Sequence, residues 1–87
     1  MSIYETLVDE YFGELLYAEG FNDAIIGLEL REMRVIYSVD KCIEILMKDM
    51  TEEEAMEHFD FNVRYAYVGE KTPIWCESIR GSRIPPA

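Results

Sequence analysis

A chain of 87 residues has room for one domain with a small core, because roughly 60–65% of the unfolded surface becomes buried at this length. Its composition is 49% hydrophobic and 13% aromatic, which indicates a globular fold and excludes a disordered chain. The net charge of −10 makes the Coulomb term repulsive towards phosphates, which excludes direct nucleic-acid binding and disfavours anionic membranes.

The acidic residues are unevenly distributed along the chain. Residues 1–23 carry six carboxylates and no lysine or arginine, whereas residues 80–87, RGSRIPPA, carry two arginines and no acid. Such a charge pattern is typical of a well-solvated surface, and it leaves open a basic protein partner or mimicry of nucleic acid. The N-terminal stretch MSIYETLVDEYF has neither the basic nor the apolar region of a signal peptide, and no apolar run is long enough to span a membrane. We therefore expect a cytoplasmic protein.

The elements predicted first along the chain are a helix and a β-hairpin. Ser2 and Glu5 form a capping-box pattern, and a three-and-four apolar spacing predicts a helix over residues 2–19 that ends at Gly20. The period then changes to two, which predicts strands over residues 24–30 and 34–37. The alternation places one set inward, with Ile25 and one of Val35 or Ile36 pointing outward, and the expected inward set is Ala24, Ile26, Leu28 and Leu30.

Two more helices and a final strand follow. Ser38 is the expected N-cap of a helix over residues 38–50. In MTEEEAMEHFDFN, Thr51 and Glu54 repeat the capping-box pattern, so the acidic run there has a structural role at the start of a helix that continues to about Gly69. Residues 73–79 then read as a strand, and residues 80–87 as a poorly ordered basic tail.

These elements predict a single α+β domain over residues 1–79 in the order α-β-β-α-α-β. We expect a small antiparallel sheet of about three strands, with helices on one face. The other face then keeps apolar side chains that no remaining element can cover, namely Ile25, Ile36, Trp75 and Ile79. Uncovered apolar surface on a small sheet indicates self-association or a protein partner, so these four residues are the expected interface.

His58 is the only histidine, and it lies four residues after Glu54, which is a usable metal-ligand spacing on a helix. A metal-dependent hydrolase centred on these two residues is nevertheless the weakest hypothesis, since a catalytic metal needs about three protein ligands and HExxH is absent. The chain also has no G-x-S-x-G, no Walker A and no G-x-G-x-x-G. Cys42 and Cys76 form no metal or redox pattern, and we expect both to be buried, reduced thiols. We expect neither an enzyme nor a bound cofactor or metal.

Residues 41–75 resemble small uncharacterised proteins of tailed phages, including cyanophages, and related marine environmental sequences. The shared motifs are E-A-x-x-x-F-x-[FY]-N, here Glu54 to Asn62, and A-Y-V-G-E-x-T-P, here Ala66 to Pro73. Similar sequences have a glycine before the Ala-Tyr pair, where this chain has Tyr65. The resemblance implies a viral accessory protein in the host cell cytoplasm and no particular activity. The leading hypothesis is a non-enzymatic homo-oligomer that binds a host protein, and the alternative is an acidic decoy that mimics nucleic acid to inhibit a host enzyme.

Overall fold

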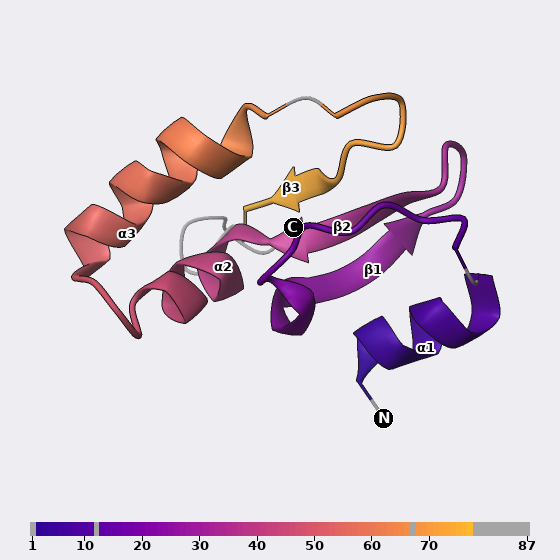
Figure 1. Ribbon diagram of the computed structural model, residues 1–87, viewed down its shortest axis with the longest axis horizontal. Coiled ribbons are helices and arrows are strands. Elements are labelled where there is room, and N and C mark those ends of the chain that lie inside the picture. The colour runs from indigo at the N-terminus through magenta and orange to yellow at the C-terminus, as the bar shows by residue number, and fades with distance from the viewer. Residues whose placement is uncertain (1, 12, 67, 78–87) are drawn as a thin grey trace, which may run out of the picture.

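The structure is a computed structural model that describes residues 2–11, 13–66 and 68–77. The described chain forms three α-helices and three strands in the expected order α-β-β-α-α-β, and these elements are α1 (Ile3–Tyr11), β1 (Ile25–Glu29), β2 (Arg34–Ser38), α2 (Val39–Leu46), α3 (Glu52–Phe59) and β3 (Ile74–Cys76) (Figure 1). A 3-10 turn over Asn22–Ala24 precedes β1, and a π-helical turn over Asp60–Arg64 continues α3. The predicted small α+β fold is confirmed. The expected basic tail over residues 80–87, and Ile79, lie outside the described residues.

The three strands form one mixed sheet in the order β1-β2-β3. β1 and β2 are an antiparallel hairpin, but β3 pairs with β2 in parallel, so the expected purely antiparallel sheet was wrong. The reason lies in the connection: β2 is followed by α2 and α3, and this helical crossover returns the chain to the end of the sheet at which β2 begins (Figure 1).

The first helix is shorter than predicted and ends at Tyr11, not at Glu19. Gly13 takes a φ of 77°, the left-handed conformation that glycine adopts easily, and there the chain leaves the helical path. Residues 15–21 instead cross the sheet, where Leu15 and Phe21 are buried (Figure 1). The backbone N–H of Ala18 donates to the hydroxyl of Tyr37 over 2.7 Å. The apolar spacing that suggested a helix is therefore satisfied by a non-helical segment packed on β2.

A β-bulge in β1 reverses the expected orientation of Ile25 and Ile26, whereas Leu28 packs against the core as predicted. Ile25 pairs with Tyr37 but Gly27 pairs with Ile36, so Ile26 is an extra residue in the register. Because side chains alternate along a strand, one extra residue exchanges the two faces. Ile25 is consequently 2% exposed and belongs to the core, whereas Ile26 is 42% exposed. The expectation that Ile25 lies on the uncovered face was wrong, as were the expected inward positions of Ile26 and of Leu30, which is 71% exposed in the β1–β2 turn.

Trp75 also lies on the opposite face from the one predicted. The parallel register places it beside Tyr37, which is fully buried, and its ring centroid lies 5.1 Å from that of Tyr37 and 5.3 Å from that of Phe59. The expectation that Trp75 lies on an uncovered face was therefore wrong. Ile74 pairs instead with Ile36, and neither isoleucine belongs to the core cluster or its packed neighbours in the described part of the chain. Of the predicted interface residues that the structure describes, Ile36 alone is placed on the face opposite the core.

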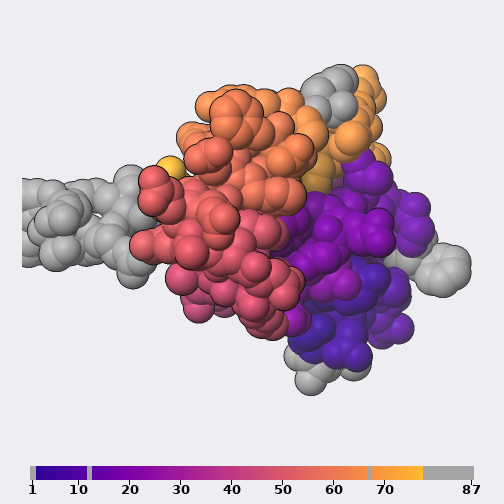
Figure 2. Space-filling model, turned by 60° about the vertical axis from the view of Figure 1, so that its left-hand side comes forward, coloured from indigo at the N-terminus to yellow at the C-terminus, as the bar shows by residue number. Residues whose placement is uncertain are grey.

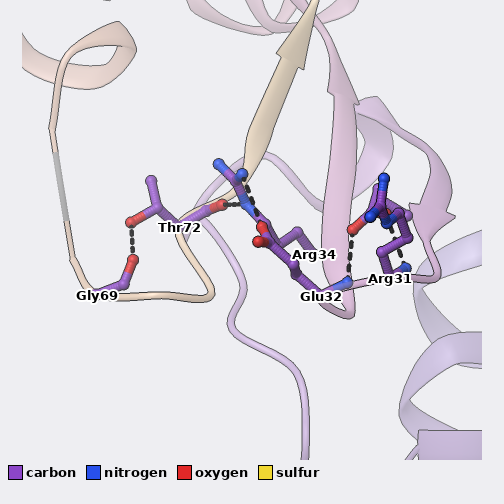
Figure 3. Close-up of polar contacts among 6 residues, drawn as sticks. Arg31, Glu32, Arg34, Gly69 and Thr72 are labelled. Atoms are coloured by element: carbon purple, nitrogen blue, oxygen red, sulfur yellow. Dashed lines mark hydrogen bonds and ion pairs between the residues drawn. The ribbon is translucent and has the colours of Figure 1, made fainter.

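The hairpin turn and the loop before β3 are held by polar contacts rather than by the Asn-Gly turn that short hairpins favour. The carboxylate of Glu29 accepts hydrogen bonds from the backbone N–H groups of Arg31 and Glu32. Arg34 donates through Nε to the carbonyl of Thr72 over 2.6 Å, which fastens the loop before β3 to β2 (Figure 3). The Glu29 contacts hold the hairpin turn, and the Arg34 contact holds the loop before β3 next to β2.

Candidate interaction surfaces

Glu54 and His58 lie on the surface of α3, and the structure shows a structural role for Glu54. Its backbone N–H donates to the Thr51 hydroxyl, and its carboxylate accepts the Thr51 backbone N–H over 2.9 Å, which together form the predicted capping box. Two hydrogen bonds with Thr51 lower the pKa of Glu54. The backbone N–H of Thr51 has the larger effect and its side chain the smaller one. The side-chain amide nitrogen of Asn62 lies 3.4 Å from Nδ1 of the His58 ring.

Glu54 and His58 line one shallow hollow with Met50, Glu57 and Phe61. Within residues 2–11, 13–66 and 68–77, no group of three or more His, Cys, Asp or Glu side chains is arranged to hold a metal ion. The two predicted ligands therefore lack the third protein ligand that catalytic zinc sites use.

The contribution of the capping box to the stability of α3 can be tested by replacing Thr51. Thr51→Ala is expected to lower the free energy of unfolding by about 0.5–2 kcal/mol, because the backbone N–H of Glu54 loses the Thr51 hydroxyl that accepts its hydrogen bond. Thr51→Ser keeps a capping hydroxyl and is expected to stay within about 0.5 kcal/mol of the original chain. Urea denaturation followed by circular dichroism measures both values. Equal losses for the two variants would show that the cap does not stabilise α3.

The two cysteines differ in reactivity because they differ in burial. Cys42 is fully buried, and burial raises the pKa of its thiol to about 12. Since the nucleophilic species is the thiolate, Cys42 is held in its unreactive form at neutral pH. Cys76 is free and exposed at the end of β3, so its expected burial was wrong.

The most exposed large apolar side chains of the π-helical turn and its continuation are aromatic. Phe61 is 81% exposed and Tyr65 is 76% exposed, and Val68 nearby is also exposed. A π-helix widens the helical turn and is often found at functional sites. In place of a further α-helical turn, it leaves Phe59 in the core and presents the following aromatics to solvent. The sequence places Phe61 off the apolar stripe of this helix, which predicts a kink or a second contact surface, and it predicts core packing with an interface anchor for the aromatic stretch 61–75. The four expected interface residues nevertheless included neither Phe61 nor Tyr65.

Tyr65 borders a shallow hollow of about 600 Å³ between the π-helical turn and β3, which we call the Tyr65 hollow. Ile74 and Trp75 contribute its apolar part, so β3 and the π-helical turn share one surface. Arg34 and Arg64 are its charged members, and the guanidinium of Arg64 lies 5.5 Å from the Tyr65 ring centre. An aromatic side chain beside arginine is the composition that protein interfaces favour.

Together these features define a small α+β domain with a three-stranded mixed sheet, whose exposed side chains include Phe61, Tyr65 and Val68. Comparison of the chain with protein-family models, curated proteins and solved structures found no match. Among the described residues, no helix has the length and apolarity needed to cross a membrane.

Proposed function

We propose that this chain is a non-enzymatic protein that self-associates and binds a host protein, as a phage accessory protein in the host cytoplasm. The observation that carries the proposal is the exposure of Phe61 and Tyr65 on the π-helical turn, next to the apolar part of the Tyr65 hollow. Burial of a water-exposed aromatic side chain against a partner contributes a large favourable free energy of binding. Tyrosine is also enriched among the residues that dominate binding energy. A second copy supplies the same apolar surface, as a two-fold dimer requires.

The charge of the chain makes a distinctive prediction about salt. Two copies with a net charge of −10 each repel one another, so association through apolar surface has to overcome this repulsion. Added salt screens the repulsion and leaves the apolar contact intact. Self-association is therefore expected to tighten when sodium chloride is raised.

Sedimentation equilibrium of the full chain at low and high salt tests the proposal. The double variant Phe61→Ser with Tyr65→Ser is expected to raise the dimer Kd by about tenfold or more, which equals about 1.4 kcal/mol. Leu30→Ser is the matched control, because Leu30 is similarly exposed but lies in the β1–β2 turn. A chain that stays monomeric at about 100 µM, a concentration that detects dimers down to weak affinity, in both salts would contradict the proposal. So would a control variant that dissociates as readily.

A second candidate function, the acidic decoy, has its own support. The six carboxylates of residues 1–23 are all exposed, which leaves a surface region with negative side chains and no cation among those residues. Such a surface resembles a phosphate backbone to a nucleic-acid-binding enzyme. Binding of a decoy weakens steeply as salt rises, whereas the apolar interface does not. Competition with DNA for a host enzyme, measured at two salt concentrations, separates the two functions.

A further inference from the structure

A groove of about 430 Å³ lies between α2 and α3. Figure 2 shows the side of the molecule that these two helices form. We call this groove the α2–α3 groove. Its floor comes from one apolar row on each helix, and these rows contain Val39, Ile43 and Met47 on α2 and the following turn, and Met56 and Phe59 on α3. The α2 residues are spaced by four, so they lie on one side of the helix. Phe59 closes the bottom of the groove from within the core.

The two methionines are the exposed part of this floor. Met47 is 42% exposed and Met56 is 53% exposed. Methionine has an unbranched, polarizable side chain that adapts to different apolar partners, and it is common on surfaces that bind helices. The helices themselves are firmly placed, because Ser38 caps α2 through the Lys41 backbone N–H and the Thr51 capping box starts α3. The groove therefore combines rigid walls with adaptable side chains.

The rim of the groove is strongly acidic. It carries five carboxylates and one guanidinium, which leaves a formal charge of −4, and these residues are Asp40, Glu44, Glu52, Asp60, Glu77 and Arg64. The guanidinium of Arg64 is engaged with the carboxylate of Asp60, 3.2 Å away. The carboxylates come from α2, α3, the π-helical turn and the residue after β3, so the negative charge surrounds the apolar floor instead of forming a separate patch.

We propose that the α2–α3 groove binds a basic amphipathic helix of another protein. An apolar stripe flanked by lysine or arginine matches an apolar floor flanked by carboxylates in both shape and charge. The eight residues of α2 extend over about 12 Å, which matches about two turns of a bound helix and anchors at spacings of three and four. Phe61 and Tyr65 do not line the groove, although Arg64 borders both the groove and the Tyr65 hollow, so the inference does not depend on self-association.

Fluorescence anisotropy with the full chain tests the inference. The probe is a labelled amphipathic peptide built only of leucine and lysine, with leucines at i, i+3, i+4 and i+7, and saturable binding is expected. Glu44→Gln with Glu52→Gln is expected to weaken binding by about tenfold or more. The matched control is Asp9→Asn with Glu10→Gln on α1, which removes the same charge away from the groove and is expected to change Kd by less than about twofold. Equal weakening by the control would overturn the proposal, because binding would then follow net charge alone.

A second measurement depends on the apolar floor and not on charge. In a chain labelled at its methionine methyl groups, the peptide is expected to shift the NMR signals of Met47 and Met56 and to leave that of Met33, in the β1–β2 turn, unchanged. Met47→Gln with Met56→Gln is expected to weaken binding by about tenfold, while the fold measured by circular dichroism is retained because both side chains are exposed. Unmoved Met47 and Met56 signals would overturn the proposal.

Two controls separate peptide binding in this groove from self-association and from occupation of the groove by residues 80–87. The same experiments on the Phe61→Ser, Tyr65→Ser variant are expected to give unchanged peptide binding, so that failure of the groove and failure of the dimer are distinguishable. The octapeptide RGSRIPPA, which corresponds to residues 80–87, serves as a competitor. If it binds the groove more tightly than the leucine–lysine peptide, the occupant is the chain's own C-terminal sequence and the proposal is overturned.

Discussion

Replacement of Phe59 by alanine is expected to lower the free energy of unfolding by about 3–5 kcal/mol, the usual cost of removing a fully buried aromatic ring. Phe59 is 1% exposed, and its ring meets those of Phe21 and Trp75 edge to face, with centroids 6.5 Å and 5.3 Å away. The loss leaves a cavity where residues 15–21, α3 and β3 meet. Because small domains are stable by only about 5–15 kcal/mol, this variant is expected to be partly unfolded at about 37 °C.

Phe61→Ala is the matched control for Phe59→Ala, since it removes the same ring two residues further along. Phe61 is largely exposed, so its replacement is expected to change the free energy of unfolding by less than about 0.5 kcal/mol. Urea denaturation monitored by Trp75 fluorescence measures both variants. Similar losses at the two positions would show that the π-helical turn does not divide buried from exposed aromatics as described.

Alkaline pH is expected to unfold the protein, because two buried groups keep their protons in the folded state. Burial raises the pKa of Cys42 from 9.0 to about 12, and it raises that of Tyr37 from 10.0 to about 12. Between these values the unfolded chain releases protons that the folded chain retains, so stability falls as pH rises from about 9 to about 12. Each unit of raised pKa corresponds to about 1.4 kcal/mol, so the combined loss amounts to several kcal/mol.

Cysteine variants separate the contribution of the thiol from that of the phenol. Cys42→Ala is expected to show a much shallower decline in stability between about pH 9 and pH 10, because only Tyr37, whose pKa in the unfolded chain is 10.0, then contributes. Cys76→Ala, which removes an exposed thiol, is expected to keep the original decline. Urea denaturation at a series of pH values measures the slopes. A decline in Cys42→Ala as steep as in the original chain would contradict the assignment.

The local patterns in the sequence predicted the helix starts correctly. The capping residues Ser2, Ser38 and Thr51 each accept the expected backbone N–H, and they start α1, α2 and α3. The start of α3 within MTEEEAMEHFDFN likewise follows from a capping box formed by Thr51 and Glu54, which lie three residues apart. Such contacts form within one helical turn, so the sequence contains all the atoms that decide them.

Errors arose wherever the partner of a residue lies far away in the sequence. The single extra residue at Ile26 exchanges the faces of Ile25 and Ile26 in β1, and the register of the parallel β3 turns Trp75 into the core. Neither the bulge nor the strand direction leaves a local signal, because both depend on which strand lies beside β2. The expected interface residues Ile25 and Trp75 were misplaced for this reason, while Phe61 and Tyr65, in the aromatic stretch predicted to combine core packing with an interface anchor, are largely exposed.

The sequence by itself determined the class of fold, the order of the elements, the helix starts and the acidic character of the surface, since these depend on short-range hydrogen bonds, hydrophobic period and composition. Only the tertiary structure decided where α1 ends, which face of each strand is buried and which aromatics remain in contact with water. Those outcomes depend on competition between distant segments for the same apolar surface. Residues 15–21 gain more from packing on Tyr37 and from the hydrogen bond between the Ala18 N–H and its hydroxyl than from extending a solvent-exposed helix.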